Sequence, residues 1–561
     1  MDSTQVVIIG GGATGAGVLW DLTLRGIPAI LLEQADMTHG ATGRCHGLLH
    51  SGGRYAVKDV ETARDCLREN RIIKEIAPHC VEATGGLFVQ LAEDDPAFFE
   101  RWWRAANEAG IPTQRLTAEE ARALEPELAE EILGAFTCPD AHVDVFRLVL
   151  ANLEAAMARG ADFRSYAQVT AMEQQDGRVA AVRYRDMRSG EEHRIACEMV
   201  VNAAGGWAGQ VAALAGAHVP VTCDKGTLLV LNHRMSRRVI NRCRVPGDAD
   251  ILVPAGPVCL LGTSSMVVAG PDGLTASKDE IDALVRQGGR MVPELAEARI
   301  LRSFSGVRAL YTPPEAAAGG RGASRSFALL DHEQLEGVAG LVSIVGGKLT
   351  TYRHMAEAVS DCVAAKLGVQ AECATATTPL RAAHSQHLQQ RAERSVERPV
   401  AAKLIERRGA EAELIVAAME QRPELAELVC ECEMVTRAEI EFVLGGPVLN
   451  EPVLNGPVLT GAALAEARTI ADIGRRTRLG FGPCQGTYCG YKAMLAGFAT
   501  KRWNAEEAVN EFTRYLNERW KGQSFVQEGK QAEQLELSRS LYGDEALTAT
   551  AAGGGDAHGT L

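Results

Sequence analysis

The sequence predicts a chain of the α/β class, in which a parallel sheet is followed by a β-rich region and then by a small helical module. Three observations lead to this prediction. A strand–turn–helix–strand pattern opens the chain, short alternating strands fill residues 216–320, and four cysteines cluster near the C-terminus. Because 561 residues are too many for one hydrophobic core, we expect two or three domains.

The composition excludes several classes of protein. With 46% apolar residues and no run of 18, the chain has no predicted membrane span, and Val6–Trp20 lacks the basic start of a signal peptide. A net charge of −14 argues against nucleic acid or an anionic membrane as the main partner. Ten of the 14 cysteines are scattered singly, which is typical of a reducing cytoplasm. We therefore expect a cytoplasmic enzyme.

The opening of the chain, as far as Glu33, predicts a βαβ unit. Val6–Ile9 is a short apolar run, a helix is expected through about Arg25, and Ala29–Glu33 is a second apolar run. The turn after the first strand reads G-x-G-x-x-G, with Gly10, Gly12 and Gly15. Such glycines let a pyrophosphate approach the helix N-terminus, and Glu33 is placed to bind a ribose hydroxyl. The pattern predicts a Rossmann-like dinucleotide-binding domain; the alternative is a glycine-rich turn with a surface carboxylate.

The same apolar pattern divides the range 1–370 into two interleaved parts. Further elements are expected as helices at 98–109, 146–159 and 351–367 and as strands at 199–205, 227–231, 251–253, 258–261 and 340–347. The dinucleotide-binding part is predicted to comprise about 1–85, 146–215 and 321–370. The β-rich substrate part is predicted at about 86–145 and 216–320.

Beyond position 370 the pattern changes. The range 371–424 is expected to form a linker and a helix, the linker covering 371–400, and a cysteine module is expected at 425–495. A proline repeat indicates an insertion at 445–464. The range 496–545 is expected to be helical, with an amphipathic helix at 503–520, and the tail 546–561 is expected to be disordered.

The loop His39–Tyr55 is too long and too glycine-rich for a simple NAD domain, which favours FAD. With this loop and Val201–Gly205, Ser305–Arg308 and Gly346–Arg353, the chain resembles the FAD-dependent glycerol-3-phosphate dehydrogenases, most closely the catalytic A subunits of the anaerobic type. The resemblance implies a D-amino-acid-oxidase-like fold. It also implies oxidation of sn-glycerol 3-phosphate to dihydroxyacetone phosphate by hydride transfer to FAD.

The resemblance also implies a set of site residues. Those expected to bind the cofactor, besides the glycine turn and Glu33, are Thr42, Gly43, Arg44, His46, Gly47, Leu48, Ala204, Gly205, Gly347 and Leu349. Those expected to contact the substrate are Arg54, Tyr55, Arg308, Lys348 and Thr350. Arginine and lysine suit a phosphate dianion. The candidate bases for the C2 hydroxyl are His50 and His46, the titratable groups of the flavin loop; the alternative is that either one bonds a flavin ring atom. The chain has Leu228 where the aerobic relatives have a histidine, so their base cannot be carried over.

The four clustered cysteines are Cys430, Cys432, Cys484 and Cys489. Their C-x-C and C-x-x-x-x-C spacings differ from the usual C-x-x-C of structural zinc sites. With the flanking Arg475–Gly480 and Gly482–Gly486, they resemble the bacterioferritin-associated-ferredoxin-like [2Fe–2S] domain. The resemblance implies a [2Fe–2S] cluster on these thiols; zinc and unmetallated thiols are the alternatives.

A flavin and a cluster in one chain predict an electron-transferring dehydrogenase. The resemblance implies that electrons pass to a second dehydrogenase subunit, to an iron–sulfur subunit that anchors the complex in the membrane, and then to a quinone. The chain would thus lie in the cytoplasm, associated peripherally with the inner face of the cell membrane. The alternatives are a related FAD/Fe–S dehydrogenase of an amino acid, amine or 2-hydroxy acid, and a non-catalytic redox sensor or scaffold.

Overall fold

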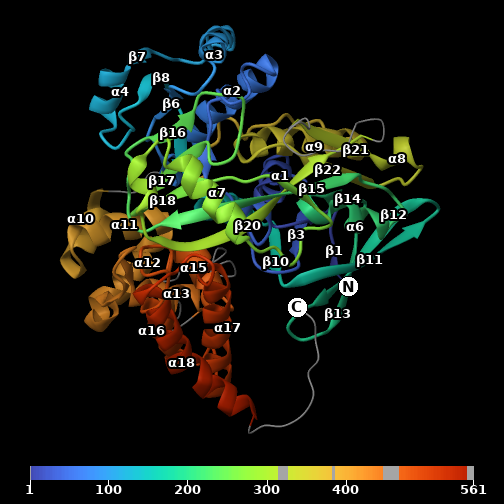
Figure 1. Cartoon of the computed structure of the whole chain (residues 1–561). Helices are drawn as coiled ribbons and strands as arrows, with labels where there is room; N and C mark the ends of the chain where they lie inside the picture. The colour runs from blue at the N-terminus through green and yellow to red at the C-terminus, as the bar shows by residue number, and fades with distance from the viewer. Residues whose placement is uncertain (1, 314–325, 382–385, 446–465, 552–561) are drawn as a thin grey trace. The chain divides into compact units, whose positions relative to one another are not determined.

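A computed structural model describes residues 2–313, 326–381, 386–445 and 466–551 of the chain (Figure 1). These residues form two compact units. Unit 1 contains the described residues up to 298 together with those from 304 to 381. Unit 2 contains residues 299–303 and those from 386 onward.

A six-stranded sheet forms the centre of unit 1. Its order is β10 (Asp162–Ser165), β3 (Ala29–Glu33), β2 (Val6–Ile9), β14 (Met199–Asn202), β22 (Leu341–Gly346) and β21 (Phe327–Asp331). The first five strands run parallel and β21 pairs antiparallel with β22. The predicted opening strands and the strands near 200 and 340 are confirmed.

Alternation along the central strands explains the layers on either side of this sheet. Val6 and Ile8 point to a core shared with helices α1 (Ala13–Leu24), α5 (Val145–Met157) and α9 (Tyr352–Leu367). Val7 and Ile9 point to a core shared with a second sheet. That sheet consists of β1 (Asp2–Ser3), β13 (Glu192–Ala196), β12 (Arg178–Asp186) and β11 (Ala167–Gln175), visible beside α6 (Ala208–Ala213) in Figure 1. Helices and a small sheet thus cover opposite faces of the central sheet, as the α/β prediction requires.

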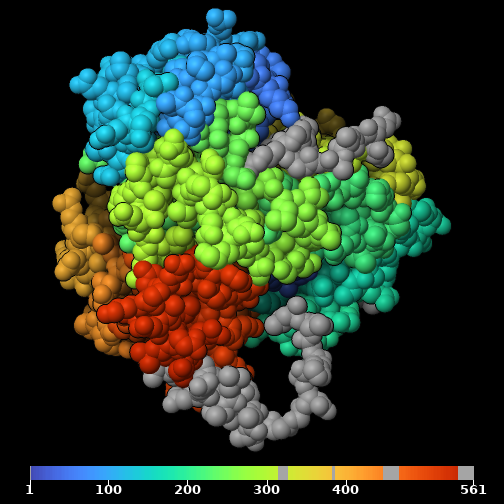
Figure 2. Space-filling model, in the orientation of Figure 1, coloured from blue at the N-terminus to red at the C-terminus, as the bar shows by residue number. Residues whose placement is uncertain are grey.

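A nine-stranded sheet forms the rest of unit 1 and confirms the predicted strands between residues 216 and 320. In order it contains β19 (Met266–Val268), β15 (Val221–Leu231), β18 (Val258–Gly262), β17 (Ile251–Ala255), β16 (Val239–Arg242), β6 (Gly86–Leu91), β8 (Ile132–Cys138) and β7 (Arg115–Thr117), while β20 (Ile300–Tyr311) pairs with β15. Trp102, on α3 (Pro96–Glu108), stacks on Phe136 and packs against Phe88. Figure 2 shows the segment around α3, coloured blue, at the top of the view.

The remaining elements of unit 1 are short, apart from two helices. They are α2 (Val60–Ile76), α4 (Ala118–Leu124), α6 (Ala208–Ala213), α7 (Lys278–Gly288), α8 (His332–Leu335) and the three-stranded sheet β4 (Leu48–Leu49), β9 (Ala141–Val143) and β5 (Val81–Glu82).

Unit 2 is mainly helical. It contains α10 (Gln386–Ser395), α11 (Arg398–Arg408), α12 (Ala412–Gln421), α13 (Arg437–Val443), α15 (Ile470–Thr477), α16 (Cys489–Ala499), α17 (Ala505–Gln523) and α18 (Lys530–Ala551), with one hairpin of β23 (Leu428–Cys430) and β24 (Val435–Thr436). The amphipathic helix expected at 503–520 is α17. None of the helices in the described part of the chain combines the length and apolarity needed to cross a bilayer.

Two expectations for the C-terminal half are wrong. The expected linker 371–400 contains α10, whose buried Leu388 and Ala392 are one helical turn apart, too narrow an apolar stripe to detect in a polar segment. Residues 546–551, expected in the disordered tail, form the end of α18. The insertion expected at 445–464 lies outside the described residues from 446 onward, as does the tail beyond 551.

Candidate functional site

A cavity of about 1380 Å³ lies within unit 1. It exceeds the ~300–1,000 Å³ of ordinary small-molecule pockets, so it has room for a dinucleotide and a small substrate together. Most of the site residues expected from the sequence line it: Gly10, Gly12, Glu33, Thr42, Arg44, His46, Leu48, His50, Arg54, Tyr55, Ala204, Gly205, Arg308, Gly347, Lys348, Leu349 and Thr350.

The glycine turn brings bare backbone to this cavity. Gly10 has φ +115°, and a Cβ there would lie 2.6 Å from the carbonyl oxygen of Ala203. Gly12, the residue before α1, has no side chain that could cap the helix. Thr42 Oγ1 accepts the Ala13 N–H at 3.1 Å. The open N-terminus of α1 therefore suits the pyrophosphate of a dinucleotide.

The Glu33 carboxylate is held at the end of β3. It accepts the N–H of Gly11 at 2.7 Å and the N–H of Ala35 at 2.9 Å. These two bonds orient the carboxylate at the cavity wall, where it can accept a bond from a ribose hydroxyl. The residues of the turn and of β3 therefore fit FAD.

Three of the glycines expected at the cofactor do not line the cavity. A Cβ on Gly15 would collide with the carbonyl of Gly10, and one on Gly43 with the carbonyl of Thr38. Gly47 has φ +65°, and its Cβ would lie 2.6 Å from the oxygen of Val143. These glycines lie where two backbone segments pack closely. They support the cavity wall without lining it.

Arg308, on β20, is held beside the cavity by β15 and its neighbours. Its Nη1 lies 2.7 Å from Asp224 Oδ2, and its Nη2 donates to the carbonyl of Ser264 at 3.0 Å and to Thr263 Oγ1. Gly226 provides the space, because a Cβ there would lie 2.6 Å from Nη2. The guanidinium is thus fixed in direction before any ligand binds.

The other predicted substrate cations come from separate parts of the chain. Arg54 Nη2 lies 3.5 Å from Asp250 Oδ2, and Lys348 Nζ lies 4.6 Å from the ring centroid of Tyr55. Thr350, which is buried, accepts the His50 N–H at 3.3 Å. The structure therefore brings residues near 50, 308 and 348 into one cavity.

The two candidate histidines differ in their surroundings. His50 is 8% exposed, and its ring lies 5.3 Å from that of Tyr55. His46 Nδ1 accepts the Leu48 N–H at 3.2 Å, so a neutral His46 ring has its proton on Nε2. Leu228 also lines the cavity. His50 is therefore better suited than His46 to accept a proton from a substrate.

A buried network behind Arg308 was not predicted from the sequence. Alternation along β15 sends Asp224 toward Arg308 and sends Lys225 and Thr227 toward Glu280. Lys225 Nζ lies 2.8 Å from a Glu280 carboxylate oxygen. Burial raises the pKa of Glu280, but hydrogen bonds from Lys225, Ser277, Ser264 and Thr227 outweigh it and lower this pKa to about 2. The only sequence signal was an Asp-Lys pair inside an apolar strand.

In unit 2 the four clustered cysteines come together from two loops and the start of α16. Their thiols are linked pairwise by hydrogen bonds, Cys430 and Cys484 to Cys489 and Cys432 to Cys484. All are free thiols. Within the described ranges, no three His, Cys, Asp or Glu side chains are grouped as a preformed metal site.

Backbone N–H groups point at these sulfurs. Those of Gly480 and Glu433 donate to Cys430, and those of Gly486 and Tyr488 donate to Cys484. A hydrogen bond from Cys489, with help from these amides, lowers the pKa of Cys484 to about 5 in spite of burial. Donating to two neighbours raises the pKa of Cys489. The backbone amides therefore favour the thiolate form at Cys430 and Cys484, whereas burial raises the pKa of Cys432.

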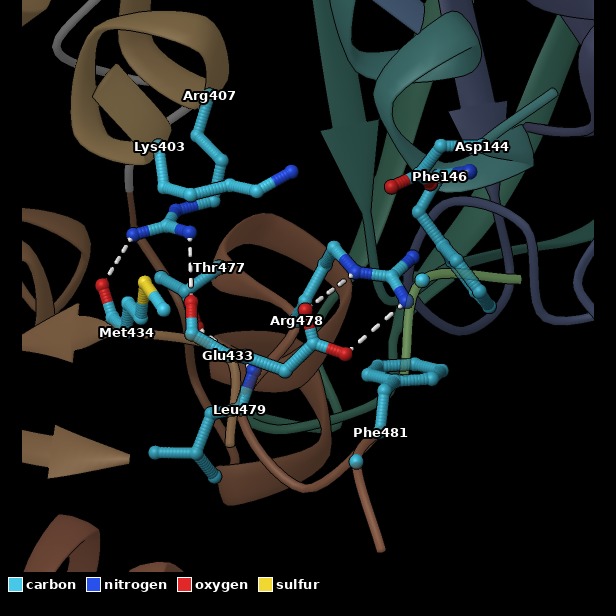
Figure 3. Close-up of polar contacts among 12 residues, drawn as sticks. Asp144, Phe146, Lys403, Arg407, Glu433, Met434, Thr477, Arg478, Leu479 and Phe481 are labelled. Atoms are coloured by element: carbon cyan, nitrogen blue, oxygen red, sulfur yellow. Dashed lines mark hydrogen bonds and ion pairs between the residues drawn. The ribbon is translucent and has the colours of Figure 1, made fainter. Parts of the chain in front are cut away.

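Two arginines fix the loop between Cys430 and β24 (Figure 3). Arg407 is 1% exposed and donates to the carbonyls of Glu433 and Met434 at 2.8 and 2.7 Å, while also pairing with Glu439. Arg478 holds the Glu433 carboxylate at 2.9 and 3.1 Å. Both the backbone and the side chain of Glu433 are thus restrained.

Comparison with known proteins identifies the family to which this chain is similar. The model of the FAD dependent oxidoreductases (DAO) matches residues 5–353. The chain is 40% identical to the A1 subunit of anaerobic glycerol-3-phosphate dehydrogenase from Haloferax volcanii, over 96% of this chain and 90% of that protein. It is 39% identical to the A subunit of anaerobic glycerol-3-phosphate dehydrogenase from Escherichia coli, over 96% of each.

Solved structures share the fold. A glycerol-3-phosphate dehydrogenase from Bacillus halodurans complexed with FAD matches with a TM-score of 0.65 at 22% identity, covering 94% of this chain and 96% of that one. Glycine oxidase from Geobacillus kaustophilus matches with a TM-score of 0.54 at 21% identity, covering 69% of this chain and 100% of that one.

Proposed function

The chain belongs to the FAD-dependent oxidoreductase family and, within it, to the A subunits of anaerobic glycerol-3-phosphate dehydrogenases, and we propose that it oxidises sn-glycerol 3-phosphate to dihydroxyacetone phosphate. The observation that carries this proposal is the convergence of Arg54, Arg308 and Lys348 on a cavity that also contains the dinucleotide-binding turn. FAD, bound by the glycine turn and Glu33, supplies the acceptor for the hydride that leaves C2 of the substrate.

The cations bind the substrate phosphate. Arg308 offers a planar fork whose orientation is set by Asp224, and Lys348 offers a point charge over the Tyr55 ring. A dianion between two cationic side chains is favoured over a neutral polyol. These side chains also orient C2, because they hold the substrate by its far end.

His50 accepts the proton of the C2 hydroxyl on a ring nitrogen as the hydride departs. Thr350 fixes the His50 backbone, and the Tyr55 ring fixes the imidazole face. Imidazole as a chemical group titrates near the working pH, which is what a general base requires. His46, with its Nδ1 engaged by Leu48, serves instead as a donor toward the cofactor.

Anaerobic mixing of the purified, FAD-loaded protein with substrate tests this function. We expect glycerol 3-phosphate to bleach the flavin absorption, glycerol to do so far more slowly, and amino acids or 2-hydroxy acids not at all. Bleaching by an amino acid, amine or 2-hydroxy acid in place of glycerol 3-phosphate would establish the rival dehydrogenase. Absence of bleaching with every substrate would indicate a sensor or scaffold.

The four-cysteine site is proposed to bind a [2Fe–2S] cluster, which passes electrons one at a time. Four cysteines on neighbouring loops, four backbone donors aimed at two of them and restrained loops all suit such a cluster. Iron and acid-labile sulfide in equal amounts, with a paramagnetic signal on reduction, are the expected result. A metal content of one zinc and no iron would show that the four cysteines bind a structural metal and not a cluster.

Further subunits are proposed to take the electrons onward to a membrane quinone. The relatives from Haloferax volcanii and Escherichia coli are named as subunits of a dehydrogenase. Exposed apolar side chains recur along one face of α16 and at the residue before it: Tyr488, Tyr491, Leu495 and Phe498. This row suits an electron-accepting partner, and Leu495→Glu with Phe498→Glu should weaken co-purification with that partner while flavin bleaching stays normal. Unchanged co-purification would place the contact elsewhere.

A further inference from the structure

Unit 2 contains a buried tyrosine hydroxyl that packs against the cysteine loops. Tyr515, on α17, is 5% exposed, and among the residues that the structure describes its hydroxyl has no hydrogen-bond partner. Leaving a buried hydroxyl unsatisfied costs about 1–3 kcal/mol. Such a group calls for a ligand or a functional reason.

The hydroxyl points at the cysteine loops. It is packed against Gly480 and Gly486, where a Cβ at either position would collide with it. Both glycines have positive φ, +79° and +93°, and their amides are the ones that donate to Cys430 and Cys484. The hydroxyl therefore lies between two groups that already point at thiolate sulfurs.

The ring of Tyr515 is held firmly in this direction. One edge packs on Gly490, where a Cβ would lie 2.9 Å from the ring, directly after Cys489. The Arg519 guanidinium lies 5.0 Å from the ring centroid, and its Nη1 lies 3.4 Å from Gln485 Oε1. A tyrosine with this packing keeps its hydroxyl against the glycines of the cysteine loops, and a phenol is protonated at neutral pH.

We propose that the Tyr515 hydroxyl donates a hydrogen bond to a sulfur of the cluster bound by the four cysteines and thereby raises its reduction potential. This inference rests on the proposed cluster. Each added electron makes the sulfurs more negative, so a donor stabilises the reduced form more than the oxidised form. The phenol keeps its proton, no covalent bond forms or breaks, and the electron comes from the flavin reaction.

The test is Tyr515→Phe in the full-length protein with both cofactors. We expect the ratio of reduced to oxidised cluster at a fixed potential to fall about tenfold, which is a midpoint about 59 mV lower for one electron. A redox titration followed by the paramagnetic signal measures this. Tyr184→Phe is the matched control: it removes a tyrosine hydroxyl that is buried on β12 of unit 1, so the midpoint should stay unchanged.

A second variant covers the case in which Tyr515→Phe loses iron. Replacing Tyr515 with 3,5-difluorotyrosine keeps the hydroxyl and makes it a stronger donor, so the midpoint should rise. An unchanged midpoint in either variant at full iron content overturns the proposal. A wild-type protein without iron and sulfide overturns the cluster as well, whereas bleaching of its flavin by glycerol 3-phosphate would still support the dehydrogenase function.

Discussion

The cavity of unit 1 and the four-cysteine site of unit 2 position their functional groups by different means. In the cavity, charged side chains hold other charged side chains, as Asp224 holds Arg308 and Asp250 holds Arg54. In the four-cysteine site, backbone N–H groups of short loops point at sulfur, and one loop is held in turn by Arg407 and Arg478. The first arrangement depends on pairs of side chains, the second on the path of the backbone.

This difference predicts how each site fails. Removing one cation from the cavity weakens ligand binding in proportion to that contact, because the other cations remain in place. In the four-cysteine site, replacing one cysteine removes a cluster ligand that no other residue supplies. Replacing a residue that holds a loop leaves such a ligand out of position. The following substitutions test that contrast.

Cys484→Ser should have the largest effect. It removes a sulfur that accepts two backbone N–H groups, so we expect loss of the iron and complete loss of electron transfer to an external quinone acceptor. Bleaching of the flavin by glycerol 3-phosphate should remain, because the hydride step belongs to unit 1. Cys362→Ser, a half-buried thiol in α9, is the control and should change neither quantity. If Cys484→Ser also abolishes bleaching, the cysteine module supports the fold of the active site.

Arg407→Met should destabilise unit 2 by about 3–5 kcal/mol, because it leaves the buried Glu439 carboxylate and two carbonyls without their donor. We expect a lower unfolding temperature and lower iron content, with FAD content unchanged. Arg391→Met removes a more exposed pair with Glu413 and Glu420 and should cost at most about 1 kcal/mol. Equal losses from the two variants would show that the Glu433 loop is not held by Arg407.

Arg308→Met should raise the apparent KM for glycerol 3-phosphate by at least about tenfold, equivalent to roughly 1.4 kcal/mol of binding. Steady-state kinetics with excess acceptor measure it. Turnover of glycerol, which has no phosphate, should change far less, and FAD content should stay normal. Equal damage to both substrates would assign Arg308 to the fold or the flavin.

Gly226→Ala should cause a smaller rise in the same KM, about threefold, or roughly 0.6 kcal/mol. The new methyl group would press on Arg308 Nη2 without removing its charge. A double variant with Arg308→Met should be no worse than Arg308→Met alone, because both act on one contact. Additive effects would mean that Gly226 serves β15 rather than the guanidinium.

Glu280→Gln should lower the unfolding temperature by an amount that is largest above pH 4.5 and fades in acid. The pKa of Glu280 is lowered from 4.5 to about 2, so its ion pair with Lys225 stabilises the fold fully above pH 4.5 and loses that contribution as the pH falls toward 2. We expect the gap in unfolding temperature between wild type and Glu280→Gln to narrow across this window. A constant gap would show that charge contributes nothing at this position.

The sequence alone determined the parts whose signal is local. The β2–α1–β3 unit and its glycine turn lie within the short range Val6–Glu33, and their apolar runs and punctuating glycines predict strand, turn and helix directly. The four cysteines and the cations near 50, 308 and 348 were identified because their flanking motifs resemble those of known families. Helix α10 was missed because its polar sequence carries only a narrow apolar stripe, and the end of α18 extends into a range that its composition suggested would be disordered.

Only the tertiary structure decided which residues hold the predicted ones. Asp224 and Arg308 are 84 positions apart, and Tyr515 belongs to α17, a different helix from the one that begins at Cys489. Neither Asp224 nor Tyr515 belongs to a motif, because an ion pair or a buried hydroxyl is specified by how strands and helices pack, not by neighbours along the chain. The sequence therefore predicts which chemical groups are present, whereas packing decides their orientation, their charge partners and how sharply each site responds to substitution.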